Sequence, residues 1–557
     1  MDGRNKRPLE SRTPDGLKSL SRSISPPRSK KQKAIEIFPS PFRLTWVRDL
    51  EEENNKNAVT LSDLLGDPLI SECWSFNYLH SISFLMDAFD RDIRPHIKVH
   101  IVHGFWKRED GNRIGLVEQA ALFPNVNLHA APMPEMFGTH HSKMLILFRR
   151  DDTAQVIIHT ANMIAKDWTN MTNAVWTSPV LSKLNKVPDD PSWREDMAQG
   201  GGHRFKFDLL SYLRCYDRMR PTCNALVESL KGYDFSSVRG SLIASVPGTH
   251  EVHGDPGVTS WGWNSMSRCL QQIHCEPGVS QVAVQVSSIA TLGGNDGWLR
   301  GTLFKALSKG KAATALSPQF KVVFPTADEI RASLDGYSSG GSIHTKIQSK
   351  QQQMQLNYLR PFFHHWMTDD DSRTGDFRDA GRDKAAPHIK TYIRTNKNDT
   401  IDWALVTSAN LSKQAWGEAA KPTGQFRIAS WEIGVLVWPS LFKDDAIMKG
   451  CFKEDTPRSR EAQGQLGEAG AVVGFRMPYS LPLRRYSREE TPWVATMRHE
   501  KEDRLGQCCH VCYAPSTTQV KSWMGMGGGD AESGGNDDAA GKSEEDLIRG
   551  YRWLLEP

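Results

Sequence analysis

The chain has 557 residues, 39% of them hydrophobic, and nine cysteines, which predicts a globular protein of more than one domain in a reducing compartment. No apolar run is long enough to span a membrane, and the first residues lack a secretory signal, so we expect neither a membrane protein nor a secreted one. Residues 1–36 carry a charge of +6 within a total of +4, which leaves −2 on the remainder. A whole-surface attraction for nucleic acid is therefore excluded, and any nucleic acid would bind in a local groove.

Residues 1–38 are predicted to form a disordered basic tail. They are rich in Ser, Pro, Lys and Arg and poor in large apolar residues, so burial cannot offset the entropy of ordering them. The cluster Pro-Pro-Arg-Ser-Lys-Lys-Gln-Lys at 26–33 is typical of a nuclear import signal and predicts a nuclear location. A merely solvated tail is the alternative.

Strands that alternate with helices follow the tail and predict α/β layers. Thr326 and Glu329 have the spacing of a capping box that begins one helix, and other helical stretches lie at 207–216 and 298–307. Short apolar runs indicate buried strands at 99–102, 144–148, 156–158, 282–286, 321–324, 390–393, 404–407 and 433–437.

Two copies of one polar cassette stand out within this pattern. Each copy has His-x-Lys, an apolar run, two small residues followed by Asn, and a Trp six residues beyond the Asn. The spacing from His to Asn is 21 residues in the first copy and 22 in the second. The copies are His141-Ser-Lys143 with Thr160-Ala161-Asn162 and Trp168, and His388-Ile-Lys390 with Ser408-Ala409-Asn410 and Trp416.

The separation of the two cassettes predicts a duplicated domain, because 247 residues from one His to the other is too long a period for a solenoid. We expect an α/β fold of two domains related by pseudo-two-fold symmetry, each a mixed β-sheet flanked by helices. The predicted domains are 39–240 and 241–557, with the active site at their interface. Residues 524–545 have the composition of a low-complexity insertion in the second domain.

The residue types of the cassette suit phosphoryl chemistry. An imidazole acts as a nucleophile or a general acid near neutral pH, a Lys ammonium holds an anionic oxygen, and an Asn amide donates to a second oxygen. One set therefore binds half of a phosphate. Two sets that face each other would place imidazoles on opposite sides of phosphorus, which suits in-line displacement without a metal.

His-x-Lys alone is a weak signal, because other tripeptides of the chain also match it. His96-Ile97-Lys98 and His344-Thr345-Lys346 are not followed at 20–22 residues by two small residues and Asn, so we interpret both as ordinary sequence. His140 has no Lys two positions on and is interpreted as structural. The two tryptophans of the cassettes are interpreted as core residues.

From about residue 40 to Trp493 the chain resembles tyrosyl-DNA phosphodiesterase, a branch of the phospholipase D superfamily. General members of that superfamily place Asp five residues after the Lys, whereas this chain has Phe148 and Thr395 there, so a lipid-hydrolase interpretation loses its signature. The resemblance is carried by 137–144, 156–164 with Asp167-Trp168, 387–392, 407–413 with Trp416-Gly417, 432–436, Ser287-Ser288 with Thr291-Leu292-Gly293, and Gly336-Tyr337 with Gly340-Gly341-Ser342.

The resemblance implies a role for each cassette residue. His141 would be the nucleophile that forms a phosphohistidine, and His388 the proton donor and acceptor. Glu432 would orient and polarise an imidazole. In the family a Gln supports the other His; here the matching Asn173 is one methylene shorter, so this contact is either direct, water-mediated or absent. Lys143, Lys390, Asn162 and Asn410 would hold the phosphoryl oxygens.

The resemblance also implies a substrate. Phe137 would stack on a base, and Ser288, Thr291 and Ser342 would contact DNA phosphates. The partners would be single- and double-stranded DNA with 3′ tyrosyl-peptide adducts, cleaved by a monomer without a cofactor or metal. Cys508-Cys509-His510-Val511-Cys512 is only half of a zinc motif.

Two other functions stay open at this point. The first is a different phosphodiesterase or nuclease of the superfamily. The second is a nucleic-acid-binding module without activity, against which the intact His, Lys and Asn of both cassettes argue.

Overall fold

The computed structural model describes residues 35–186, 197–255, 257–311, 317–368, 375–457 and 470–508. The predicted tail up to residue 34, its import signal, the insertion at 524–545 and Cys509 to Cys512 of the half zinc motif lie outside these ranges. Residues 36–38 were predicted as tail but form a strand, β1 (Glu36–Phe38), because they pair in parallel with a strand near the other end of the described chain, β20 (Ala471–Arg476).

The first large sheet is built from the N-terminal half of the chain. Its strands run in the order β2-β8-β7-β6-β3-β4-β5, with β9 paired to β7 at one end. These strands are β2 (Phe42–Leu44), β3 (Ile70–Phe76), β4 (Lys98–His103), β5 (Val126–Ala130), β6 (Met144–Arg149), β7 (Thr153–His159), β8 (Ala174–Thr177) and β9 (Leu181–Ser182).

The second large sheet repeats this arrangement with later strands, in the order β10-β18-β16-β15-β12-β13-β14. Four antiparallel pairings followed by two parallel ones occur in the same sequence in both sheets. The strands are β10 (Ser241–Ser245), β12 (Ser280–Gln285), β13 (Gln319–Val323), β14 (Phe363–His364), β15 (Thr391–Asn396), β16 (Ile401–Thr407) and β18 (Glu432–Val437).

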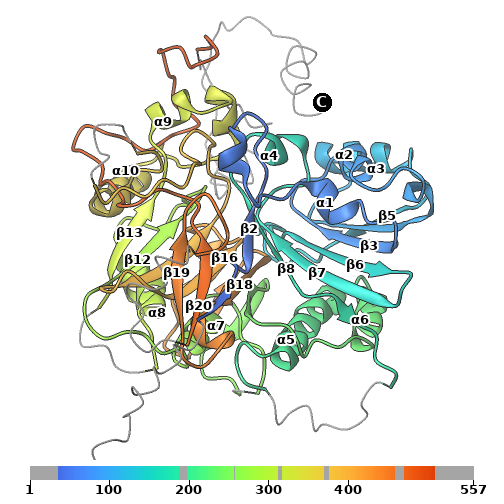
Figure 1. Cartoon of the computed structure of the whole chain (residues 1–557). Coiled ribbons are helices and arrows are strands. Elements are labelled where there is room, and N and C mark those ends of the chain that lie inside the picture. The colour runs from blue at the N-terminus through green and yellow to red at the C-terminus, as the bar shows by residue number, and fades with distance from the viewer. Residues whose placement is uncertain are drawn as a thin grey trace, which may run out of the picture.

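Helices flank both large sheets (Figure 1), so the predicted α/β architecture of two mixed sheets flanked by helices is confirmed. The capping box of α9 also forms as predicted, because Thr326 and Glu329 each accept the other's backbone N–H. The helices are α1 (Leu61–Leu65), α2 (Ile82–Asp87), α3 (Gly111–Ala120), α4 (Ala165–Thr169), α5 (Gly202–Arg214), α6 (Asn224–Lys231), α7 (Gly262–Leu270), α8 (Lys305–Leu307), α9 (Ala327–Ala332), α10 (Lys350–Leu359) and α11 (Lys413–Trp416).

The two sheets share a core. One cluster of buried apolar side chains contains Ile146 and Ile158 of the first sheet together with Val406 and Val435 of the second. Strands β6 and β16 are apolar on both faces, as expected for strands covered on both sides. The halves are therefore joined by packing along β6, β7, β16 and β18, and the cassettes lie at the ends of β6, β7, β15 and β16.

Smaller pairings complete the fold. β19 (Ala446–Cys451) joins β1 and β20 in a third sheet, which links the first described strand to the last. β11 (Gly248–Glu251) pairs with β17 (Gln425–Ile428). Within the described ranges no helix is both long and apolar enough to cross a membrane. The division into domains at residue 240 stays a prediction; β10, the edge strand of the second sheet, begins at Ser241.

Candidate active site

Each cassette lies at the end of a strand pair. His141 to Lys143 directly precede β6 and Asn162 follows β7; His388 to Lys390 directly precede β15 and Asn410 follows β16. The tripeptides are extended segments before the strands, not parts of them as the apolar run at 390–393 suggested. The ammonium group of each cassette lysine donates a hydrogen bond to the backbone carbonyl of the histidine two residues before it. The distance is 3.2 Å in the first cassette, and the second cassette makes the same hydrogen bond.

The two halves interlock at the cassettes through backbone hydrogen bonds. The N–H of His141 donates to the carbonyl of Trp431 at 3.0 Å, and the N–H of His388 donates to that of Thr172, also at 3.0 Å. Trp431 directly precedes Glu432, and Thr172 directly precedes Asn173. Each half thus carries, next to its own cassette, the segment that holds the histidine of the other half.

His141 is supported by a carboxylate of the other half. Its Nδ1 lies 2.9 Å from Oε2 of Glu432, and the same oxygen accepts the Ser408 hydroxyl at 2.6 Å. A carboxylate at Nδ1 favours the tautomer with the proton there, which leaves the Nε2 lone pair for a substrate. The His141 side chain is 16% exposed, against 5% for His388. Burial lowers its pKa to about 4 although Glu432 acts in the opposite direction, so the imidazole is neutral at pH 7.

His388 is supported by two groups of the first half. Its Nδ1 lies 3.2 Å from Oδ1 of Asn173 and 3.1 Å from Oδ2 of Asp167. The shorter Asn173 side chain therefore reaches the imidazole without a bridging water, which decides among the three possibilities that the sequence left open. Burial lowers the pKa of His388 well below its usual range, and the charges of Lys390 and Lys143 lower it further.

The first residue of each small-small-Asn triplet binds the side chain that supports the histidine of the other cassette. The Thr160 hydroxyl donates to Asn173 Oδ1 at 2.8 Å, as the Ser408 hydroxyl donates to Glu432. Each hydroxyl in turn accepts the backbone N–H of the residue that follows its partner, at 3.0 Å and 2.9 Å. A hydroxyl is needed at this position for that relay, which explains why Thr and Ser occupy it.

Asp167 is a site residue that the sequence did not single out. Its Oδ2 accepts the backbone N–H of Asn162 at 2.6 Å and also approaches His388. Burial raises the pKa of Asp167, while the Asn162 N–H and the charges of the lysines act against that change. The available signal was the pair Asp167-Trp168, five and six residues after Asn162, whereas the second cassette has Ala415 at the matching place.

The lysines and asparagines converge on the same centre. Lys143 and Lys390 are fully buried; burial lowers the pKa of Lys143 to about 8 and that of Lys390 well below its usual value. Asn410 Oδ1 accepts the N–H groups of Ser287 and Ser288 at 3.1 and 2.9 Å, which turns the amide NH₂ in the other direction. Such an arrangement supplies several N–H donors to one small anion.

Three of the residues predicted to contact DNA lie on the second half, and the fourth, Phe137, lies on the first. Ser288 and Ser342 are half-buried, and Thr291 is exposed and accepts Gln352 Nε2 at 3.1 Å. Phe137 is 47% exposed beside Gly138, where a Cβ would lie 1.9 Å from the Ala429 carbonyl oxygen. That close approach of the backbones holds the Phe137 segment of the first half against the second.

His344 was interpreted as ordinary sequence, and the structure places it next to the second cassette. Its N–H donates to the Ser287 carbonyl at 2.9 Å and its carbonyl accepts the Ile289 N–H at 2.8 Å, which places it beside the serines that hold Asn410. Burial lowers its pKa to about 4, and the charges of Lys166, Lys346 and Lys390 act in the same direction. No local pattern reveals this position, because it depends on the pairing of two distant segments. His96, by contrast, is exposed.

The remaining residues that the sequence singled out have structural surroundings. Both ring nitrogens of His140 have partners, the Asn77 carbonyl and the Tyr216 hydroxyl at 3.0 Å each, which supports its structural interpretation. Trp168 and Trp416 are buried in the core as predicted. Within the described ranges no group of three or more His, Cys, Asp or Glu is placed to hold a metal ion.

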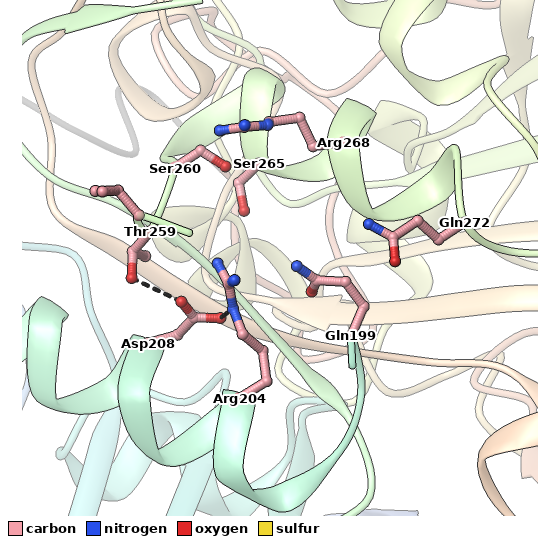
Figure 2. Close-up of a pocket in the computed structure, with 9 residues that line it drawn as sticks. Gln199, Arg204, Asp208, Thr259, Ser260, Ser265, Arg268 and Gln272 are labelled. Carbon is pink, nitrogen blue, oxygen red and sulfur yellow. Dashed lines mark hydrogen bonds and ion pairs between the residues drawn. The ribbon is translucent and has the colours of Figure 1, made fainter. Parts of the chain in front are cut away.

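A small pocket of about 50 Å³ lies between α5 and α7, apart from the cassettes (Figure 2). Arg204 and Asp208 form an ion pair of 2.8 Å there, and the Thr259 hydroxyl donates to the same carboxylate at 2.6 Å. This buried ion pair lies within α5, and none of the predicted site residues lines the pocket.

Comparisons with known proteins agree with these features. The family model described as tyrosyl-DNA phosphodiesterase matches residues 41–487. A probable tyrosyl-DNA phosphodiesterase of Schizosaccharomyces pombe is 30% identical, with 86% of this chain and 97% of that protein covered. Tyrosyl-DNA phosphodiesterase 1 of Arabidopsis thaliana is 29% identical over 85% and 77% of the two chains. The crystal structure of the yeast tyrosyl-DNA phosphodiesterase superposes with a TM-score of 0.56 at 20% identity, covering 81% and 98%, and supports the fold.

Proposed function

The chain belongs to the tyrosyl-DNA phosphodiesterase family, a group of phosphodiester hydrolases in the phospholipase D superfamily, and from this we propose that it hydrolyses the 3′-phosphotyrosyl bond between DNA and a topoisomerase I-derived peptide. Other 3′ adducts would be substrates where the leaving group fits. The observation that carries the proposal is the crossed support of two histidines at one centre, His141 by Glu432 and His388 by Asn173 and Asp167.

The first step is attack of His141 Nε2 on phosphorus. The P–N bond forms as the bond from phosphorus to the tyrosyl oxygen breaks, and the imidazole becomes cationic beside Glu432. The leaving oxygen departs on the opposite side, where His388 donates a proton to it. His388 must therefore be protonated in the complex. The anionic phosphodiester favours that state because it offsets the charges of Lys143 and Lys390 that lower the His388 pKa in the free protein.

The second step is hydrolysis of the phosphohistidine. His388, now neutral, removes a proton from water, the water oxygen bonds to phosphorus, and the P–N bond breaks to release 3′-phosphate DNA and neutral His141. Throughout, Lys143, Lys390, Asn162 and Asn410 hold the non-bridging oxygens and stabilise the charge that spreads over them in the transition state. The two halves therefore have unequal tasks in spite of their matching topology.

The proposal extends to the substrate and to the location of the enzyme in the cell. Single- and double-stranded DNA would bind as partners, with Phe137 stacked on a base and Ser288, Thr291 and Ser342 against phosphates. The enzyme would act as a monomer in the nucleus, in DNA repair. Removal of residues 1–34, which precede β1, should leave turnover in vitro nearly unchanged and impair nuclear entry. Loss of turnover on this truncation would contradict the assignment of the tail.

The direct test uses a single-stranded oligonucleotide with a 3′-phosphotyrosine, incubated with the protein in EDTA and resolved on a denaturing gel. We expect conversion to the 3′-phosphate product. His141→Ala should abolish it, and His96→Ala, in the exposed His-Ile-Lys tripeptide, is the matched control. Loss of all activity on chelation would refute the metal-free mechanism.

A second experiment distinguishes the role of His388 from that of His141. With p-nitrophenol, a leaving group that needs little protonation, His388→Ala should still form the phosphohistidine but hydrolyse it slowly. A covalent protein–DNA adduct should then accumulate and be visible by denaturing electrophoresis. A lipid hydrolase or a general nuclease of the superfamily would instead cleave its own substrates in preference to the tyrosyl oligonucleotide.

A further inference from the structure

A group of basic residues that the cassettes do not include flanks the catalytic centre. His344 lies beside the serines that hold Asn410, and Lys346 follows two residues later. Along this segment Ile343 and Thr345 are buried, while His344 and Lys346 are half-buried. Alternate residues of an extended chain share a side, so the imidazole and the second ammonium face the open side together.

Lys166 approaches this segment from the other half of the molecule. It lies on α4, directly before Asp167, and its ammonium donates to the carbonyl of Ser338 at 2.5 Å. It packs so closely on Gly341 that a Cβ there would lie 3.2 Å from Lys166 Nζ. The charges of Lys166 and Lys346 are the two that most lower the His344 pKa after burial, which agrees with all three groups lying together.

The charges nearby explain why this group attracts an anion. In the cassettes the positive charge of Lys143 lies near the negative charge of Glu432, and the positive charge of Lys390 lies near the negative charge of Asp167. Lys166 and Lys346 add two positive charges, and Asp335 opposes Lys166 from the adjoining turn. Two lysines beyond those of the cassettes therefore lie beside the catalytic centre, and an ammonium group binds a phosphate oxygen through a charge-assisted hydrogen bond.

We propose that Lys166, His344 and Lys346 bind the internucleotide phosphate next to the scissile one on the DNA strand. The inference rests on the proposed function. A DNA strand places a phosphate at every nucleotide, whereas a peptide adduct has no fixed negative charge at any position. Ser288 and Ser342, the serines expected against DNA phosphates, lie on the same two segments, one paired with His344 and the other two residues before it.

The test compares two single-stranded 3′-phosphotyrosyl oligonucleotides of one sequence. One has a neutral methylphosphonate at the linkage adjacent to the scissile phosphate, and the other has it four linkages away. On the second oligonucleotide, Lys166→Met and Lys346→Met should each raise KM roughly tenfold with little change in kcat. The parent protein should show a similar rise in KM on the oligonucleotide with the adjacent methylphosphonate. On that oligonucleotide the two variants should show little further rise in KM.

The dependence of KM on salt concentration gives an independent test of this phosphate contact. Because one phosphate contact is lost, the slope of log KM against log salt should become less steep by about 0.7 in the double variant. Lys166→Arg keeps the charge and should restore KM nearly to that of the parent. Lys98→Met, in the other His-Ile-Lys tripeptide, is the surface control. Thermal unfolding of each variant reports any loss of the Lys166–Ser338 contact.

Several results would overturn the inference. These are an unchanged KM in both lysine variants, a rise that persists in full on the adjacent methylphosphonate, or a loss confined to kcat. A loss seen with a peptide adduct but not with a bare tyrosyl group would place the peptide there instead. Failure of the proposed function is distinguishable, because the parent protein would then release tyrosine from neither oligonucleotide.

Discussion

Replacing Asp167 by Asn tests the support of the general acid. The change keeps the shape of the side chain but removes the charge that lies 3.1 Å from Nδ1 of His388. If His388 is the proton donor, it is cationic in the enzyme–substrate complex, and a carboxylate at this distance stabilises that cation. The loss should therefore fall on the step in which the leaving oxygen is protonated.

The structure sets the size of the effect. Two unit charges 3.1 Å apart attract by about 5 kcal/mol at an effective dielectric constant of about 20, which is an upper bound. The remaining Asn173 contact and the amide dipole of the new Asn recover part of this, because an uncharged hydrogen bond still contributes about 1 kcal/mol. A net loss of about 2–3 kcal/mol corresponds to a decrease of roughly 30- to 150-fold in the rate of tyrosine release.

The assay is single-turnover kinetics with tyrosyl and p-nitrophenyl leaving groups on the same oligonucleotide. Asp167→Asn should slow tyrosine release strongly and p-nitrophenol release little. The descending limb of the pH profile should move to lower pH, because removing the carboxylate lowers the pKa of bound, protonated His388. Equal losses on both substrates, or no loss at all, would refute the argument; no loss would mean that Asp167 stays protonated. Thermal unfolding controls for the buried change.

Three further outcomes follow from the same geometry. Glu432→Gln should slow formation of the phosphohistidine roughly 10- to 100-fold with either leaving group, because the cationic imidazole loses its carboxylate; a selective loss on tyrosine would contradict this. Phe137→Ala should raise KM for the oligonucleotide several-fold and leave KM for a mononucleotide ester of p-nitrophenol unchanged; an equal rise for both would argue against stacking. Burial lowers the pKa of His140 and His159 to about 3, so the unfolded chain takes up protons that the native state does not. The melting temperature should hold above about pH 6.5 and fall as the pH drops towards 4; a constant value would contradict that assignment.

Local patterns sufficed for most of the regular structure. The strands predicted at 99–102, 144–148 and 433–437 all form, because continuous apolar runs bounded by polar residues have few alternatives to a strand covered on both faces. The stretch at 298–307 is a π-helix followed by a single α-helical turn rather than one regular helix. β1 was missed because its partner β20 is far away in the chain, and a three-residue strand has no periodicity of its own.

The residues of the site divide in the same way into those that a local pattern reveals and those that depend on contacts between distant segments. The sequence by itself determined the two cassettes, because His, Lys and Asn recur at a spacing that two adjacent antiparallel strands impose. Only the tertiary structure decided which group supports which histidine, because those partners lie 291 residues apart for His141 and Glu432 and 215 for His388 and Asn173. Asp167 and His344 were passed over for this reason. Their positions depend on contacts between distant segments of the chain, and such contacts leave no periodic trace in the sequence.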